Sequence, residues 1–332
     1  MPLSPEKRFL VDRVTDAIYA CGWNVVFANH DHPVRLRAFK GDQVLELLVY
    51  IWRLTPGGPA GVRPAGELRI QLTGVPPPLL RGPDFKTLLL GWHQPTGIFA
   101  GFDVARRPQV WGASPSVQIR FSAISDAQAS GFGSYRRATA GEGEIAIAFA
   151  PDSFMEYVLQ QSNLHEFAEN VREAEALETA MRGQPVDLDR VLGEGRREAI
   201  RKVLERVGQG NFRLRVLTAY EYHCAMCEIQ LDLVQAAHIV PVAADGDNQT
   251  RNGLALCYLH HEAYDRALIG VTPDYRISIS PTAVQRLERL RRTSKLRGFR
   301  ENLRDRIFLP VRERDYPDED RLRRGLQLRG WN

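Results

Sequence analysis

Cysteines and long apolar segments are scarce in this chain. Only 4 of its 332 residues are cysteine, which excludes a disulfide framework and favours metal binding in a reducing compartment. No stretch reaches the ~20 consecutive apolar residues of a membrane helix, and residues 1–20 lack the apolar core of a signal peptide. We therefore expect a cytoplasmic protein with no membrane partner.

The composition shows no strong bias. The chain is 44% hydrophobic and 25% charged, which is typical of globular proteins with buried cores. It contains no internal repeat and no low-complexity segment. A length of 332 residues exceeds that of one ordinary domain, so at least two domains are expected.

The net charge is only +4, but the charges are unevenly distributed. Residues 281–332 contain 15 Lys and Arg against 8 Asp and Glu, a surplus of +7, so the rest of the chain carries −3. Basic residues collected at one end favour a polyanionic partner such as nucleic acid. An arginine-rich helical surface exposed to solvent is the alternative interpretation.

The first 160 residues alternate between helical and strand-like patterns. Helical spacing after a candidate N-cap at Ser4 predicts a helix at 5–20. Apolar runs predict strands at 23–28, 34–39, 44–52, 67–73, 87–90, 97–102 and 145–149, and short helices fit 124–130 and 152–161. The fold class predicted for residues 1–160 is α+β, with a mixed and mainly antiparallel sheet.

The pattern then changes twice. Residues 161–210 are helical and rich in charge, interrupted by Gly183-Gln184-Pro185, and they are interpreted as a helical connector. Residues 211–332 form a third segment, which contains three of the four cysteines and ends in the basic extension described above. We expect residues 1–160 and 211–332 to form the two main domains.

Four metal-ligand residue types occur in two short pairs. Cys224 and Cys227 are separated by two residues, and Cys257 and His260 repeat that spacing 30 residues later. Thiolate and imidazole are the preferred ligands of zinc, and structural sites are closed and four-coordinate. One such pair could arise by chance, but two predict a structural Cys3His zinc site.

Three motifs overlap this zinc pattern: AAHIVP at 236–241, NGLALC at 252–257 and HHEAYD at 260–265. Together they resemble the HNH (ββα-metal) endonuclease family, in a branch that also carries zinc-binding cysteines. The resemblance covers about 120 residues at the C-terminal end. It implies a β-hairpin and a helix that hold one divalent cation against the scissile phosphate of a nucleic acid.

The resemblance also assigns roles to individual residues. It implies that His238 is the general base that deprotonates the attacking water, a role that suits an imidazole. It implies that Asn252 braces the loop or lies near the metal, and that His261 binds the catalytic cation. Asp265 is one helical turn after His261 and could supply a carboxylate to the same cation.

This chain departs from the family pattern at one position. Many members have an acidic metal ligand directly before the general base, where this chain has Ala237. His261 with Asp265 is the expected ligand set, and Asp245 or Asp247 is the alternative source of a carboxylate. The expected cofactors are Mg²⁺ or Mn²⁺ at the catalytic site and Zn²⁺ at the structural site, where metal binding supplies folding free energy.

The first half has candidate contacts to DNA but no recognised family. Aromatic residues could hold a flipped base while arginines contact phosphate, although aromatic residues on strands more often belong to the core. The aromatic candidates are Trp52, Trp92, Phe99, Phe102 and Trp111, and the arginines are Arg35, Arg37, Arg69, Arg106, Arg107, Arg120, Arg136 and Arg137. A degenerate restriction-endonuclease core built from Glu46, Glu67 and Arg69 is a weaker interpretation.

These observations favour a metal-dependent endonuclease that hydrolyses DNA, with a role in restriction or antiviral defence. Residues 1–160 would select the DNA, with or without base modification. Double-stranded DNA is the expected partner, and a homodimer is expected because one HNH finger cuts one strand. The alternative is a zinc-containing DNA-binding or regulatory protein with an inactive finger, which Ala237 would favour.

Overall fold

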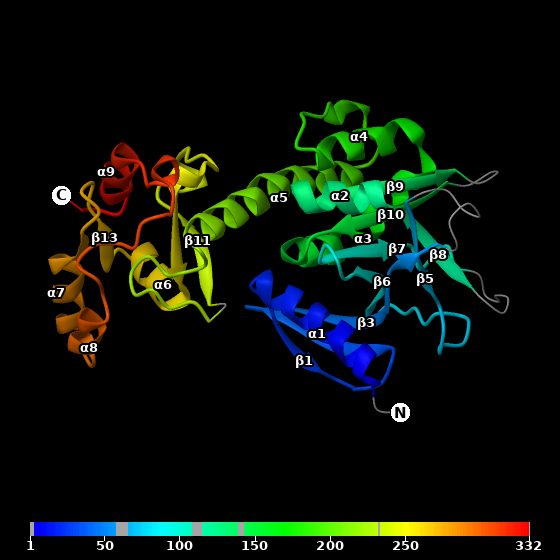
Figure 1. Ribbon diagram of the computed structural model, residues 1–332, viewed down its shortest axis with the longest axis horizontal. Coiled ribbons are helices and arrows are strands. Elements are labelled where there is room, and N and C mark those ends of the chain that lie inside the picture. Colours follow the sequence, from blue (N-terminus) through cyan, green and yellow to red (C-terminus); the bar gives the residue numbers. More distant parts are fainter. Residues whose placement is uncertain (1–2, 58–65, 108–114, 139–142, 232, 332) are drawn as a thin grey trace. The chain divides into compact units, whose positions relative to one another are not determined.

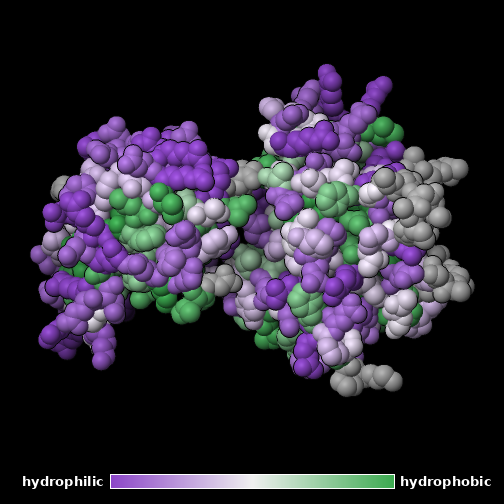
Figure 2. All heavy atoms as spheres, viewed as in Figure 1, coloured by the Kyte–Doolittle hydropathy of each residue, from purple (hydrophilic) through white to green (hydrophobic). Residues whose placement is uncertain are grey.

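The computed structural model describes residues 3–57, 66–107, 115–138, 143–231 and 233–331, and these form two compact units, Met1–Gly210 and Asn211–Asn332 (Figure 1). Hydrophilic residues dominate the visible face of each unit, with apolar patches between them (Figure 2). None of the helices in the described ranges has the length and apolar character that crossing a bilayer requires.

The first unit contains both helices and strands, as its sequence pattern predicts. Its helices are α1 (Pro5–Ala20), α2 (Phe121–Ser130), α3 (Phe154–Glu166), α4 (Val171–Met181) and the first part of α5 (Glu194–Ala219), with 3-10 turns η1 (Pro151–Ser153), η2 (Phe167–Glu169) and η3 (Leu188–Arg190). Its strands are β1 (Asn24–Phe27), β2 (Val34–Lys40), β3 (Gln43–Arg53), β4 (Thr55–Pro56), β5 (Glu67–Gln71), β6 (Lys86–His93), β7 (Ile98–Phe102), β8 (Ser116–Arg120), β9 (Phe132–Ala138) and β10 (Gly143–Phe149).

Two sheets organise this unit. The larger has seven strands in the order β1-β2-β3-β6-β7-β10-β9, and the smaller has the order β4-β5-β8. The β3–β6 pair is parallel and the other pairs are antiparallel. The predicted α+β class with a mixed sheet is thus confirmed.

Each face of the large sheet has its own core. On one face, side chains of α1, α3, α4 and α5 pack against β2, β3, β6 and β10. On the other face, β5, β8 and α2 pack against β3, β6 and β7. The central strands β6 and β7 are buried along almost their whole length because both faces are covered. Residues 161–207, predicted to be a connector, contribute Leu164, Leu177 and Ile200 to the first core.

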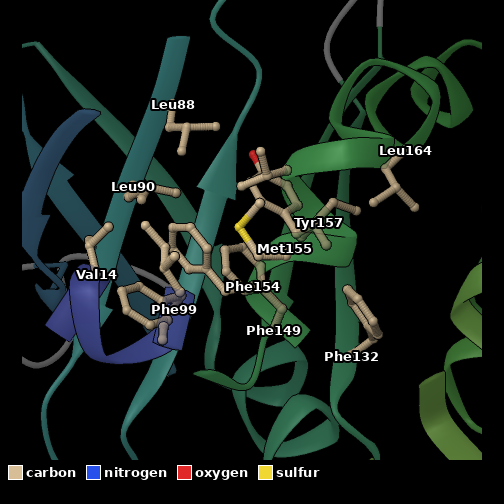
Figure 3. Close-up of a cluster of buried hydrophobic side chains, with 14 of the residues drawn as sticks. Val14, Leu88, Leu90, Phe99, Phe132, Phe149, Phe154, Met155, Tyr157 and Leu164 are labelled. Atoms are coloured by element: carbon tan, nitrogen blue, oxygen red, sulfur yellow. The ribbon is translucent and has the colours of Figure 1, made fainter. Parts of the chain in front are cut away.

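Tyr157 lies in the buried core near Phe149 and Phe154 (Figure 3), and it leaves no room for a side chain at Gly101. The Tyr157 hydroxyl donates to Nε2 of His165 at 3.1 Å, and Nδ1–H of His165 donates to the Ile145 carbonyl at 2.9 Å. The phenol is therefore fixed in place. A Cβ atom at Gly101 would lie 2.2 Å from the phenol oxygen, which is far inside van der Waals contact.

Gly101→Ala should therefore destabilise the first unit by roughly 3 kcal/mol, at the upper end of overpacking costs. The expected fall in its Tm is roughly 6–12 °C, measured by differential scanning calorimetry. Gly298→Ala is the control, because nothing lies within 4 Å of a Cβ at that position. An unchanged Tm for Gly101→Ala would mean that Tyr157 is not held as described.

The aromatic candidates for base contact belong to the core. Phe99 and Phe102 are fully buried, and Trp52 and Trp92 are 7% exposed, so the core interpretation holds for these four; Trp111 lies outside the described residues. Glu46 pairs with Arg37 in the large sheet, whereas Glu67 and Arg69 belong to the small sheet. The three residues of the proposed restriction-endonuclease core thus lie in different sheets and share no site.

The second unit is smaller and has one core. It contains the end of α5 and the elements β11 (Val234–His238), η4 (Val242–Ala244), η5 (Thr250–Asn252), β12 (Gly253–Cys257), α6 (Tyr258–Asp265), β13 (Ile269–Val271), β14 (Ile277–Ile279), α7 (Pro281–Arg289), α8 (Leu296–Glu301), η6 (Glu313–Asp315) and α9 (Glu319–Leu328). In its core, the end of α5 packs with the β11–β12 hairpin, α6 and β13. Strands β13 and β14 form a second antiparallel hairpin.

Candidate functional site

The hairpin β11–β12 and helix α6 form a ββα unit that carries two separate clusters of polar residues. In the antiparallel register His238 pairs with Gly253 at one end, and Val234 pairs with Cys257 at the other. Helix α6 begins directly after Cys257. Its adjacent residues His260 and His261 point in different directions, because successive residues on a helix are rotated by about 100°.

His260 faces the cysteine cluster. The potential ligand atoms of Cys224, Cys227, Cys257 and His260 all lie within 4.8 Å of one another. Nδ1 of His260 is 3.4 Å from Sγ of Cys224 and 3.3 Å from Sγ of Cys257. Ligands of a tetrahedral zinc ion lie about 3.5–3.8 Å apart, so these residues fit a zinc ion with Nδ1 as the histidine ligand.

The thiols of this cluster influence one another's ionisation. The pKa of Cys224 is lowered, chiefly because the Cys257 thiol donates a hydrogen bond to it, and that same bond raises the pKa of Cys257 to about 11. Burial raises the pKa of Cys227. Zinc binds the thiolate form of cysteine, so binding of a divalent cation at this cluster should release protons.

At the opposite end of the hairpin, His238 is held on two sides. Nε2–H of His238 donates to Oδ1 of Asn248 at 3.0 Å, and this bond leaves the Nδ1 lone pair as the basic site. The ring of Phe212 is stacked on the imidazole, with centroids 3.9 Å apart and an interplanar angle of 9°. Phe212 comes from α5 and Asn248 from the loop between the hairpin strands.

Gly253 makes this stacking possible. A Cβ atom at Gly253 would lie 2.3 Å from Val216 and 3.0 Å from the Phe212 ring. Because Gly253 pairs with His238 in the sheet, the bare backbone allows α5 to approach the strand end closely. The glycine of the NGLALC motif therefore has a packing role beside the imidazole.

Asn252 is fully buried and fixes the loop that follows His238. Its Oδ1 accepts from the Val240 amide at 2.9 Å, and its Nδ2 donates to the carbonyls of Val240 and Asp247 at 3.0 and 2.8 Å. These three hydrogen bonds satisfy both polar groups of the Asn252 side chain within the protein. Its geometry fits the loop-bracing role rather than a metal ligand.

His261 is positioned beside Asp265. Its Nδ1–H donates to Oε1 of Gln235 at 3.1 Å, and Nε2 faces Oδ2 of Asp265 at 3.4 Å. Burial lowers the pKa of His261, and the neighbouring charge of Asp265 opposes this shift. The lowered pKa favours the neutral imidazole that metal binding requires.

This pair fits one octahedral cation. Adjacent ligands of Mg²⁺ lie about 3 Å apart, close to the 3.4 Å between His261 and Asp265. Metal-binding histidines usually donate their second N–H to a neighbour that fixes the ring. Here Oε1 of Gln235 accepts that bond from Nδ1–H of His261. Two protein ligands leave the other coordination positions to water and phosphate oxygens. Mg²⁺ in proteins commonly keeps several bound waters.

Arg329, directly after α9, connects the strand end at His238 to α6. Its guanidinium donates to the carbonyls of Ile239 at 2.7 Å and His238 at 3.2 Å. It also lies 3.5 Å from Asp265 and 4.1 Å from the centre of the Tyr264 ring. The side chain is 8% exposed, so it acts as a buried connection between the two candidate residues His238 and Asp265.

The alternative carboxylates are less suited to the cation. Position 237, where many family members carry an acidic ligand, is an alanine buried at 1% exposure in the hairpin core. Asp247 is held by Arg321 through two bonds of 2.9 Å, and Asp245 is exposed in a left-handed turn. Of the predicted candidates, Asp265 is the one that lies beside His261.

Sequence reasoning missed the residues that hold these groups. Phe212, Gln235, Asn248 and Arg329 contact His238 or His261, yet all four lie outside the family motifs quoted above. The sequence contained one weak indication, for Gln235. It lies two residues before Ala237 and therefore on the same face of the strand.

Comparison with known proteins agrees with this geometry. Residues 224–272 match the family model described as HNH endonuclease, and residues 45–158 match the one described as Methylase-associated X1. One solved structure, described as a modification dependent TagI restriction endonuclease, is similar over 84% of this chain and 80% of that chain, with 11% identity and a TM-score of 0.31. No curated protein matches the chain. The predicted resemblance is confirmed: the second unit contains an HNH endonuclease domain.

Proposed function

We propose that the protein is a metal-dependent endonuclease that hydrolyses phosphodiester bonds of DNA. The observation that carries this proposal is the Arg329 guanidinium, which lies 3.2 Å from the His238 carbonyl and 3.5 Å from Asp265 and so links the His261–Asp265 pair to the strand end at His238. His238 presents Nδ1 as a base, and the neighbouring pair fits one hard cation. The match of residues 224–272 to the HNH endonuclease model supports it.

In this reaction Nδ1 of His238 takes a proton from a water molecule as that water attacks the phosphorus atom. Asn248 keeps the other ring nitrogen protonated, and Asn252 fixes the loop that carries Asn248. Mg²⁺ or Mn²⁺ held by His261 and Asp265 would supply charge stabilisation at the phosphate and the leaving oxygen. Zinc held by the Cys3His cluster would stabilise the fold of the unit.

The biological role that we infer is restriction or antiviral defence. Residues 45–158 match a family named for its association with methylases, and a methylase beside an endonuclease is the arrangement of a restriction-modification system. The first unit would then select the DNA, with or without base modification. Two strands must be cut, so we expect duplex substrate and two protomers acting together.

A cleavage assay tests this function directly. Supercoiled plasmids that carry unmodified or modified bases are incubated with the protein and Mg²⁺, Mn²⁺ or Ca²⁺, and nicked and linear products are separated on agarose. Nicking with Mg²⁺ or Mn²⁺ on at least one substrate is expected. The inactive-finger alternative, which the buried Ala237 favours, predicts DNA binding without nicking on every substrate and with every metal.

Asn248→Ala should lower kcat for DNA cleavage about tenfold with little change in DNA affinity, because nothing then keeps the proton on Nε2 of His238. Asn248→Asp is the matched control: it retains an oxygen acceptor opposite Nε2 and should be closer to the wild type. Single-turnover cleavage at saturating DNA measures both. Equal rates for alanine and aspartate would show that the bond does not position the imidazole.

A further inference from the structure

A shallow pocket next to the candidate catalytic site is lined by arginines. It has a volume of about 520 Å³ and lies wholly within the second unit. The cationic residues at its wall are Arg215 of α5, Arg251 of η5 and Arg314 of η6, and the remaining lining residues are Asn248, Gln249, Thr250 and Asp315. Three positive charges against one negative charge make the lining cationic.

The arginines are anchored yet accessible. Arg215 donates to the Asn248 carbonyl at 2.6 Å, and Arg251 pairs with Asp318 at 3.2 Å. Arg314 lies 3.9 Å from its neighbour Asp315, with 72% of its side chain exposed. A guanidinium has five N–H donors, so each of these arginines can contact a phosphate and keep its protein contact.

The pocket is directly connected to the general base. Asn248 lines the pocket with its loop neighbours and also accepts from Nε2 of His238 at 3.0 Å. Arg215 holds the backbone of the same asparagine. Phosphates of one DNA strand follow each other at about 3.4 Å of helix rise, so those next to the scissile phosphate must pass close to His238.

A second pocket in this unit has the opposite character. It is about 400 Å³ in volume and contains four carboxylates against two arginines. The carboxylates belong to Asp245, Asp247, Asp318 and Asp320. A polyanion would be repelled there, so the pocket around Arg215 is the better path for a DNA backbone.

We propose that the pocket formed by Arg215, Arg251 and Arg314 binds a backbone phosphate of the DNA strand that is cut, next to the scissile phosphate. This inference rests on the proposed function and adds a binding subsite to it. The contacts are to phosphate and carry no sequence preference, as is usual for arginine contacts to the backbone. The subsite holds the strand in register with His238.

The test is the salt dependence of DNA binding, which does not require cleavage. A fluorescein-labelled duplex, modified or unmodified, is titrated with the protein in Ca²⁺ at several NaCl concentrations. Each phosphate contact contributes about 0.9 to the slope of log Kd against log salt. The double variant Arg215→Gln/Arg314→Gln should reduce that slope by about 0.9, because one phosphate contact is lost, and raise Kd at least tenfold at moderate salt.

The control is the charge-matched double variant Arg190→Gln/Arg201→Gln, whose side chains are 85% and 45% exposed and belong to the first unit, outside the basic extension. It should retain the wild-type slope. The subsite is refuted if both double variants change the slope equally, or if the wild type binds no duplex. If the slopes differ as expected but the wild type cleaves no plasmid, the subsite stands and the proposed catalysis fails.

Discussion

His238→Ala is expected to lower the rate of Mg²⁺-dependent DNA cleavage by a factor of about 10²–10⁴, the usual contribution of a general base. The variant loses the one group that presents a basic nitrogen between Phe212 and Asn248. DNA affinity and zinc content should be unchanged, because the cysteine cluster lies at the other end of the hairpin.

Three measurements distinguish loss of the base from loss of structure. Single-turnover cleavage gives the rate, fluorescence anisotropy gives DNA affinity, and atomic emission gives zinc content. His30→Ala is the control, because His30 is an exposed histidine of the first unit. Full cleavage activity in His238→Ala would place the base elsewhere and end the proposed mechanism.

Cys257→Ser should unfold the second unit while the first remains folded. Cys257 is both the last residue of β12 and the N-cap of α6, so zinc bound there would join the hairpin, the helix and the Cys224–Cys227 turn. Zinc binding contributes about 10–16 kcal/mol in small zinc-finger peptides. That contribution is comparable with the entire ~5–15 kcal/mol stability of an ordinary domain.

Limited proteolysis with mass spectrometry follows this loss residue by residue. Cleavage sites should appear throughout 220–331 in Cys257→Ser, and residues 3–200 should stay protected outside their loops. Cys21→Ala removes a thiol from the first unit and should keep the zinc content of the wild type. A Cys257→Ser protein that retains one zinc per chain and resists proteolysis would show that the cluster is not a structural zinc site.

Much of the architecture was predictable because it depends on local pattern. The helix at 5–20 and the strand at 44–52 agree with α1 and β3 to within one residue at each end, since their apolar spacing is regular. Strands β8 and β9 were missed. Their apolar residues alternate with polar and charged ones over only five to seven positions, and a long-range partner decides such strands.

The candidate site divides in the same way. The ligands and His238 stand in short motifs, so sequence alone could name them. Phe212 and Arg329 lie 26 and 91 residues from His238 in the chain, and only the fold brings them to its ring and its backbone carbonyl. Pairings of this kind depend on tertiary packing, which no local pattern encodes.

The position of Arg329 has a practical consequence for purification. Arg329 supplies a buried guanidinium to the backbone of His238, the proposed general base. Cleavage by a contaminating protease before residue 329 would remove that anchor. A preparation cleaved there is expected to bind DNA and to lack cleavage activity, so the integrity of this segment should be checked by mass spectrometry before activity is scored.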